Sequence, residues 1–257
     1  MTGTDDRRLM TPSLYKTIAT PDGKRRYVRA LFATIADRYD FITVALSYGQ
    51  DQRWKRRVIA LAEPRHGLRV LDLATGTGDL AFAAAARGAR VVGLDITYRM
   101  IELARRKSEP ASPKREEREG GQGRDRAPER GALQFIVGDM LALPFPAASF
   151  DIVTTGYGLR NVPDLPQAID EIRRVLAPGG RVVSLDFNRP VSPWIRSAYL
   201  AYLTVVGAAL GWILHRDPDT YRYIPASIRH YPGAAAVARM FEDRGFSRMR
   251  HYRVLGD

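Results

Sequence analysis

Short apolar runs alternate with helix-prone segments along most of the chain. Strands are predicted at residues 68–73, 89–94, 133–137, 150–155 and 180–187, and helices at residues 79–87, 99–107 and 166–176. Strands that alternate with helices at this interval are typical of βαβ units. The pattern therefore predicts an α/β fold with a Rossmann-like, doubly wound, mostly parallel sheet and helices on both faces. In such sheets, ligands bind beyond the carboxyl ends of the strands.

Two segments depart from this alternation. Residues 108–131 are dense in Arg, Glu, Gly and Pro and contain almost no apolar residue except Ala, so we expect a disordered insertion in a surface loop. Residues 198–214 carry no charge and are flanked by Arg196 and His215. This run is shorter than the roughly 20 residues of a membrane span and contains polar positions, so it predicts a buried or interfacial helix.

The amino-acid composition excludes several kinds of functional site. The chain of 257 residues is 45% hydrophobic and 26% charged, which is typical of a globular domain. It has no Cys, which excludes disulfides, thiolate metal sites and cysteine nucleophiles. The four His residues are scattered without ligand spacing, so we expect no metal site. Residues 1–16 lack the apolar core of a signal peptide, so we expect a cytoplasmic protein.

The net charge of +12 is carried by particular segments. Residues 1–60, 105–130 and 186–257 contribute +6, +3 and +4, while the middle of the chain is close to neutral. Such a distribution suits an anionic membrane surface or nucleic acid, although an Arg-rich surface that is merely solvated gives the same count. The basic residues are not interleaved with aromatic residues in one stretch, and no nucleic-acid module is recognisable, so we expect no nucleic-acid partner.

The Gly-rich turn in VLDLATGTGDLA (70–81) carries the most specific signal. A predicted strand runs through Gly76, Thr77 and Gly78 directly into a helix, an arrangement that lets the backbone approach a ligand closely. Asp95, at the end of the next strand, is placed to accept hydrogen bonds from ribose hydroxyls, although it could instead cap the following helix. The same glycine spacing also matches a nicotinamide dinucleotide site.

Two further features favour S-adenosylmethionine over a nicotinamide dinucleotide. Asp72 lies at the end of its strand, where a carboxylate would hold a cationic amino group but repel a pyrophosphate. After the 133–137 strand, Asp139 and Met140 offer an acidic and an apolar group that suit an adenine, although Asp139 could be an ordinary turn residue. With Gly156, these positions complete the predicted cofactor-binding set.

Several longer stretches give the chain a family resemblance. They are RYDFITVALSYGQDQRWKR (38–56), VLDLATGTGDLA (70–81), GLDI (93–96), ALPFPAASFD (142–151), GYGLRNVPD (156–164), RVLAPGGRVVSLDF (174–187) and DTYRYIPASI (219–228). With them the chain resembles the class I S-adenosylmethionine-dependent methyltransferases and, within these, the ubiquinone/menaquinone biosynthesis C-methyltransferase family. The GLRNVPD and DTYRYIPASI stretches carry the narrower resemblance. The surroundings of Gly156 resemble the menaquinone branch.

The resemblance implies a domain plan and partners. A methyltransferase domain at 27–257 would follow a flexible segment at 1–26, with a helical substrate-side cover at 27–60 and a helical lid at 188–232. The implied cofactor contacts are Thr77, Asp95, Asp139 and Met140. The implied substrate is a polyprenyl quinol, which suggests peripheral contact with the inner face of an anionic membrane; a homodimer is also compatible.

The implied reaction transfers a methyl group from a sulfonium to a ring carbon of the quinol. The resemblance places Arg160 and Asn161 near the ring, as catalytic residues. Because guanidinium stays protonated, Arg160 would stabilise the phenolate rather than act as a base; alternatively, it forms a salt bridge to Asp164 or Asp186. Tyr39, Asp40, Tyr221 and Tyr223 are expected on the substrate side, or as ordinary aromatic packing.

The chain also departs from the family pattern. Thr43 stands where the family usually has Asn. After one predicted strand at 246–255, we expect the family's last, antiparallel strand to be missing. These departures leave open a non-catalytic protein that binds quinol or partner enzymes. Methylation of another small molecule is a further alternative.

Overall fold

The computed structural model describes residues 16–47, 49–109, 132–188 and 193–252. Five strands form one sheet in the order β3-β2-β1-β4-β5, and all four strand pairs are parallel. The strands are β1 (Arg69–Leu73), β2 (Arg90–Asp95), β3 (Leu133–Val137), β4 (Phe150–Gly156) and β5 (Leu176–Leu185). The α/β fold is confirmed, and all five predicted strands are present.

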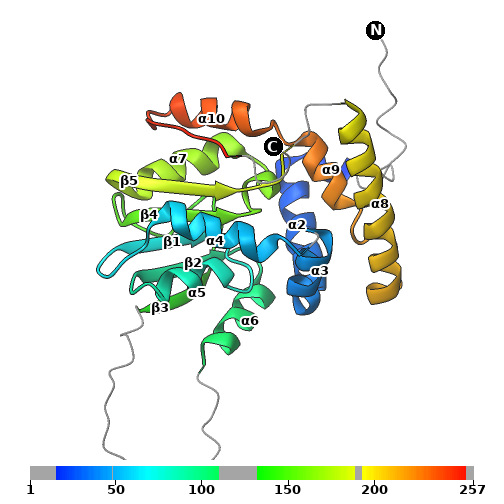
Figure 1. Ribbon diagram of the computed structural model, residues 1–257, viewed down its shortest axis with the longest axis horizontal. Coiled ribbons are helices and arrows are strands. Elements are labelled where there is room, and N and C mark those ends of the chain that lie inside the picture. Colours follow the sequence, from blue (N-terminus) through cyan, green and yellow to red (C-terminus); the bar gives the residue numbers. More distant parts are fainter. Residues whose placement is uncertain (1–15, 48, 110–131, 189–192, 253–257) are drawn as a thin grey trace, which may run out of the picture.

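Helices cover both faces of the sheet (Figure 1). One face is packed by α4 (Asp51–Ala62), α5 (Asp79–Ala85) and α6 (Tyr98–Ser108), and the other by α7 (Leu165–Val175) and α10 (Ala234–Glu242). Successive side chains of β1 point to opposite faces, so Val70 packs in the first layer while Leu71 and Leu73 pack in the second. Strands buried on both faces read as continuous apolar runs, which explains their clear signal in the sequence.

A second group of helices lies beyond the carboxyl ends of the strands (Figure 1). It comprises α2 (Pro21–Ile35), the 3-10 helix η2 (Ala36–Arg38), α3 (Tyr39–Leu46), α8 (Pro193–His215) and α9 (Tyr223–His230). Leu31, Ile42, Leu203 and Ile228 are buried together in their shared core. We call this group the cap. Helices are present in the described parts of 27–60 and 188–232, while the roles predicted for these segments as a substrate-side cover and a lid stay predictions.

The structure corrects three details. The segment 1–26 was expected to be flexible, but α2 begins at Pro21, so the boundary falls inside a helix. Within the predicted cover, α4 packs on the sheet through Trp54 and Val58 rather than in the cap. No strand is found at residues 246–252, so the part of the predicted 246–255 strand that the structure describes is irregular. Most of the predicted insertion, residues 110–131, lies outside the described residues.

Candidate active site

The Gly-rich turn leaves β1 where the strand order of the sheet reverses, between β1 and β4. At such a switch point the loops diverge and open a crevice. Gly76 and Gly78 have φ angles of 55° and 94°, in the left-handed region that favours glycine. This backbone conformation turns the chain from β1 into α5 within five residues. The predicted tight turn is therefore present at the predicted place.

The carboxylate of Asp95 holds this turn against the end of β2. Its Oδ2 accepts a hydrogen bond from the Gly76 backbone N–H at 2.9 Å, and its Oδ1 accepts one from the Thr97 N–H at 2.8 Å. The side chain is buried, and burial raises the pKa of Asp95 above its ordinary value. Because each carboxylate oxygen has a second lone pair, Asp95 can still accept two hydroxyl groups of a ligand.

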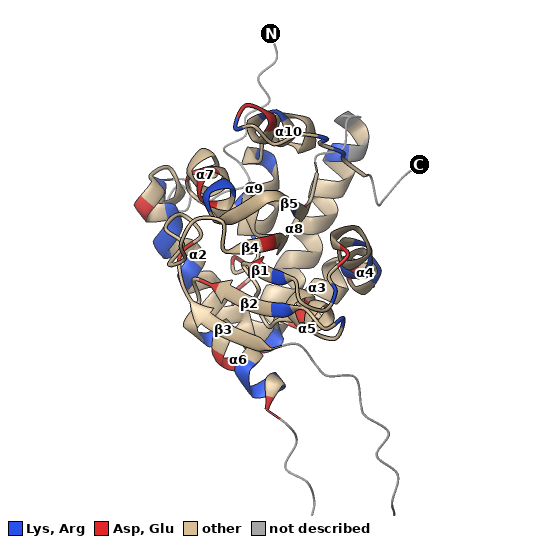
Figure 2. Cartoon of the chain, turned by 90° about the vertical axis from the view of Figure 1, so that its left-hand side faces the viewer, with Lys and Arg blue, Asp and Glu red and all other residues tan. Residues whose placement is uncertain are grey.

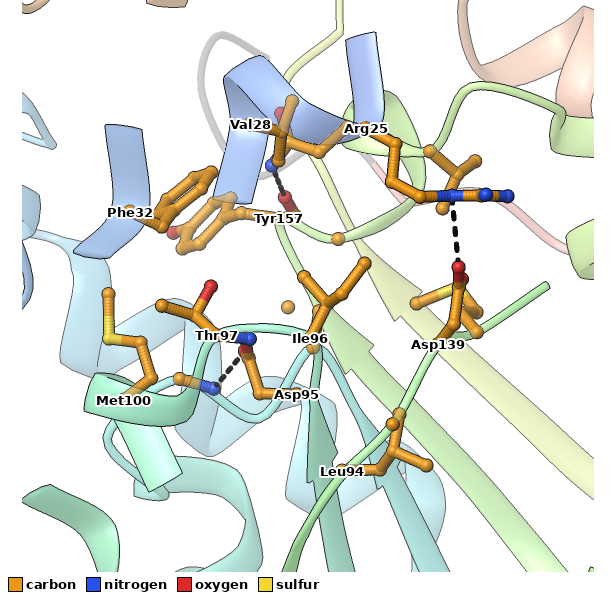
Figure 3. Close-up of a pocket in the computed structure, with 18 of the residues that line it drawn as sticks. Arg25, Val28, Phe32, Leu94, Asp95, Ile96, Thr97, Met100, Asp139 and Tyr157 are labelled. Carbon is orange, nitrogen blue, oxygen red and sulfur yellow. Dashed lines mark hydrogen bonds and ion pairs between the residues drawn. The ribbon is translucent and has the colours of Figure 1, made fainter. Parts of the chain in front are cut away.

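A cavity of about 700 Å³, including the space at its open mouth, lies beyond these strand ends (Figure 3). Its walls are mostly apolar and come from the cap and from the β2 and β3 ends, with Val28, Phe32, Leu94, Ile96, Met100 and Met140 among the lining residues. Arg25 and Asp139 form an ion pair at its rim, with Nε 3.1 Å from Oδ2 (Figure 3). A mostly apolar lining with a few polar groups is typical of a small-molecule site.

A second, smaller cavity of about 320 Å³ adjoins the first. The two share the lining residues Tyr39, Ala74, Gly76, Gly156 and Tyr157. The smaller cavity differs in character because Lys55, Asp72 and Asp79 contribute charged groups to its wall. We call the two spaces the apolar lobe and the charged lobe of the cleft.

Asp72 lies at the base of the charged lobe. Its Oδ2 accepts a hydrogen bond from the Thr75 hydroxyl at 2.6 Å, and its Oδ1 accepts one from the Thr154 hydroxyl at 2.7 Å. Burial raises the pKa of Asp72 to about 6, although both hydroxyls stabilise the ionised form. A buried carboxylate of this kind gains most from a cationic ligand, which would restore its ionised state.

Most residues predicted to bind the cofactor line the cleft. Gly76, Asp95, Asp139, Met140 and Gly156 line the apolar lobe, and Asp72 and Thr77 line the charged lobe. Gly78 lines neither. A Cβ built there would lie 2.8 Å from the Phe82 ring and 2.9 Å from the Phe135 ring, so this glycine permits close packing beneath the turn. The structure gives Gly78 a role in the turn, and its contact with a ligand stays a prediction.

Of the two residues predicted to be catalytic, one lines the cleft and the other does not. Asn161 lines the apolar lobe, and its Nδ2 donates to the Tyr157 carbonyl at 2.9 Å. Its Oδ1 is buried without a hydrogen-bond partner among the described residues. Arg160 lines neither lobe; it is buried, and its Nη1 lies 3.0 Å from Oδ1 of Asp186. The alternative expectation of a salt bridge to Asp186 is thus confirmed, and Asp164 instead caps α7.

Of the four residues predicted on the substrate side, one lines the cleft and three do not. Tyr39 lines both lobes. Asp40 lines neither: its Oδ1 accepts a hydrogen bond from the Thr77 hydroxyl, and its Oδ2 pairs with Lys107. Tyr221 and Tyr223 are buried inside the cap and line neither lobe. Their direct contact with a ligand in these lobes is therefore not supported, and aromatic packing accounts for their burial.

The sequence predicted a helical substrate-side cover at 27–60, but none of the α2 residues that line the apolar lobe was singled out as a site residue. Arg25, Val28 and Phe32 of α2 all face this lobe (Figure 3). A signal for this helix exists, because Thr20 caps it by accepting a hydrogen bond from the Gly23 N–H and Pro21 occupies its first turn. Lys55 was also missed as a site residue, although it lies within the 38–56 stretch.

Comparison with known proteins identifies the family to which this chain belongs. A model of the ubiE/COQ5 methyltransferase family matches residues 20–256. The chain belongs to this family. It is 40% identical over 220 residues to "Demethylmenaquinone methyltransferase" of Thermus thermophilus, an alignment that covers 84% of this chain and 91% of the relative. It is 36% identical over 238 residues to "Ubiquinone/menaquinone biosynthesis C-methyltransferase UbiE" of Paracoccus denitrificans, covering 92% and 88% of the two chains.

A solved structure supports the fold of this methyltransferase. The crystal structure of the [4+2]-cyclase SpnF superposes with a TM-score of 0.50 and 19% identity, covering 70% of this chain and 74% of that one. The chain is a methyltransferase that uses S-adenosylmethionine as its methyl donor. The cleft fits this cofactor chemically, since the apolar lobe suits an adenine, Asp95 suits a ribose and the charged lobe suits an amino acid.

The elevated pKa of Asp72 predicts how cofactor binding depends on pH. As the pH falls through about 6, Asp72 takes up a proton and loses the charge that attracts an ammonium group. We expect the affinity for S-adenosylmethionine, measured by calorimetry, to fall by about tenfold between pH 7.5 and pH 5. Asp72→Asn should bind more weakly at pH 7.5 and lose most of this dependence. An equally steep profile in the variant would contradict the assignment.

Proposed function

We propose that this methyltransferase transfers a methyl group from S-adenosylmethionine to a ring carbon of a polyprenyl quinol, converting a demethylmenaquinol to a menaquinol. The names of the relatives support this acceptor. The observation that carries the proposal is Asn161 Oδ1, which belongs to a residue of the apolar lobe and has no hydrogen-bond partner among the described residues. Arg160 Nε and Tyr223 Oη are also buried and lack partners in the described part of the chain, although their residues line neither lobe. The three atoms lie on η3 (Leu159–Asn161) and on α9 of the cap, which contact each other.

Unpaired buried polar atoms are costly, so their presence supports a polar ligand at this place. Asn161 Oδ1 can accept a hydrogen bond from a quinol hydroxyl, and Arg160 Nε can donate one to a phenolate oxygen. Burial opposes the charge of the guanidinium, but the Asp186 carboxylate raises the pKa of Arg160 above its ordinary value. Arg160 therefore remains a cation and stabilises negative charge on the substrate rather than removing its proton.

The chemistry requires orientation more than acid–base catalysis. Bound S-adenosylmethionine supplies an electrophilic methyl group on a positively charged sulfur. The phenolate oxygen raises electron density on the adjacent ring carbon, which bonds to the methyl carbon as the carbon–sulfur bond breaks. The proton on that ring carbon then leaves to water and aromaticity is restored. The cap contributes by excluding water and holding the ring, which is worth up to about 7–11 kcal/mol in favourable cases.

The decisive assay combines the purified full chain, labelled S-adenosylmethionine and a panel of reduced demethylnaphthoquinols and demethylbenzoquinols under anaerobic conditions. We expect label in the reduced naphthoquinols and none in the matched oxidised quinones, because only the reduced ring forms a phenolate. Cofactor binding without transfer to any quinol would instead support the non-catalytic alternative. Transfer to a different small acceptor would retain the enzyme and replace the substrate.

We further propose that α8 rests on the inner face of an anionic membrane, where a polyprenyl quinol resides. Of the described residues, Arg196–His215 is the segment long and apolar enough to cross a membrane, yet only 22% of its apolar 18-residue stretch is buried. One face packs in the cap through Leu200 and Leu203. The opposite face exposes Trp194, Ala198, Ala201, Val205, Ala209, Trp212 and Ile213.

Charge favours a lipid surface as the occupant of this face. The exposed stripe is about 27 Å long from Trp194 to Trp212 at 1.5 Å per residue. Arg196 lies near the start of the stripe and Arg216 follows its end, α8 contains no acidic residue, and most of the helix is tan, that is uncharged, in Figure 2. Arg38 lies against its end, where Nη1 donates to the Leu214 carbonyl at 2.6 Å. A helix that is apolar on both its buried and its exposed face, with Trp on the exposed face and basic residues near its ends, suits the membrane interface, where Trp is enriched.

Sedimentation with vesicles of phosphatidylcholine and phosphatidylglycerol tests this surface. We expect Val205→Glu/Trp212→Glu to lower vesicle binding at least tenfold by burying charge in the acyl boundary. Tyr98→Glu, an equally exposed aromatic position on α6, is the matched control and should bind as the wild type does. Unchanged vesicle binding by the double variant, or its conversion of a homodimer to a monomer, would contradict the membrane assignment.

A further inference from the structure

Lys55 occupies a position in the cleft that the proposed reaction does not use. It projects from α4 into the wall of the charged lobe and is 12% exposed. Among the described residues, Arg25 and Lys55 are the cations that line the cleft, and they lie in different lobes. Arg25 pairs with Asp139 in the apolar lobe. Any anionic part of a ligand in the charged lobe would therefore face Lys55.

The position of Lys55 is set by two carboxylates. Its Nζ lies 2.6 Å from Oδ2 of Asp51 and 2.7 Å from Oδ2 of Asp79. Asp51 is almost fully buried, and its Oδ1 accepts a hydrogen bond from the Tyr157 hydroxyl at 3.0 Å. A lysine ammonium has three N–H donors, so these two contacts leave one donor for the lobe. The flexible side chain is thus held in one place before any ligand binds.

The two lobes suit different parts of one ligand, an apolar part and a charged part. With the ribose at Asp95, the adenine matches the apolar lobe and the amino-acid end of S-adenosylmethionine must enter the charged lobe. Asp72, Asp79 and Lys55 together give that lobe one surplus negative charge. The cofactor, with an ammonium, a carboxylate and a sulfonium, has one surplus positive charge. The net charge of the lobe therefore balances the net charge of the cofactor. The carboxylate of the cofactor still needs a cation beside it, because the other charged groups of the lobe are acidic.

We infer that Lys55 binds the α-carboxylate of S-adenosylmethionine and thereby determines the preference of this enzyme for the carboxylated donor over its decarboxylated form. In this arrangement Asp72 faces the α-amino group, and Asp51 and Asp79 position the lysine. The inference rests on the use of S-adenosylmethionine and not on the identity of the methyl acceptor. It assigns a specificity role to a residue within the 38–56 stretch.

Calorimetry with two ligands separates this role from a structural one. Wild type should bind S-adenosylmethionine about 10- to 100-fold more tightly than decarboxylated S-adenosylmethionine, the range expected for a hydrogen bond between charged groups. Lys55→Met should lose that factor for S-adenosylmethionine and bind the decarboxylated ligand within threefold of the wild type. Arg53→Met removes the same charge from an exposed position on α4 and should bind both ligands as the wild type does.

A second variant guards against a folding defect, because Lys55→Met leaves the buried Asp51 without its cation. Asp51→Asn/Lys55→Met removes both charges and should show the same loss of discrimination. An equal loss of affinity for both ligands, or no loss for either, would overturn the inference. If the wild type binds neither ligand, the cofactor assignment itself fails, which is a distinct result from the same titration.

Discussion

Arg160→Met is expected to lower the free energy of unfolding by about 3–5 kcal/mol and to reduce kcat for quinol methylation at least about 100-fold. The stability loss arises because Asp186 is buried and would keep an unpaired charge once the guanidinium is gone. The loss of turnover arises because the phenolate would lose its stabilising cation. Urea unfolding and anaerobic kinetics measure the two effects separately.

A double variant distinguishes these effects. Arg160→Met/Asp186→Asn removes both members of the buried pair, so most of the stability should return while kcat remains low. The neutral amide at position 186 can still accept the hydrogen bond that the Arg160 backbone N–H donates at 3.1 Å. If turnover returned together with stability, Arg160 would serve only to hold the loop. That outcome would end its proposed role in substrate stabilisation.

Asp95→Ala is expected to weaken the binding of S-adenosylmethionine at least about 100-fold. The variant loses two hydrogen bonds from the backbone N–H groups of Gly76 and Thr97, and with them two acceptors for the ribose hydroxyls. Hydrogen bonds to a charged group contribute about 1.5–3 kcal/mol each, so the loss of the ribose contacts alone supports this magnitude. Calorimetry or equilibrium dialysis at pH 7.5 gives the measurement.

Asp151→Ala provides the matched control for Asp95. Asp151 also accepts a hydrogen bond from a strand backbone N–H, that of Arg69 at 2.9 Å, but it lies at the amino end of the sheet. Its loss should leave cofactor affinity unchanged, since the crevice opens at the carboxyl ends. Binding by Asp95→Ala within threefold of the wild type would remove the basis for placing the nucleoside at this turn.

The order of strands and helices could be predicted from the sequence because burial leaves a local pattern. β3 was predicted at its observed residues, and α6 and α7 to within one residue at each end. The Gly76 turn and Asp95 were found for the same reason. Glycines and a carboxylate that directly follow an apolar run are recognisable within a few residues of sequence, and Gly76 does have a positive φ. The start of α2 was also predictable, because Thr20 and Pro21 form a local start signal, yet residues up to 26 were predicted to be flexible.

The assignment of individual side chains to the site could not be predicted in the same way. Arg160 and Asp186 are 26 positions apart, and only the packing of η3 beside the end of β5 brings their charges within 3.0 Å. Tyr39 lines the cleft while the adjacent Asp40 turns outward to Thr77 and Lys107, a choice set by how α3 packs. Adjacent residues on a helix point in different directions, so a matching stretch of sequence does not reveal which of them meets the ligand.

By itself, the sequence determined the α/β architecture, the position of the glycine turn and the acidic residues after successive strands, because hydrophobic period and backbone conformation are properties of neighbouring residues. Only the tertiary structure decided that α2 roofs the cleft, that Arg160 is paired and that Lys55 enters the charged lobe. Those outcomes depend on contacts between distant segments, in which burial and charge pairing are settled together rather than residue by residue.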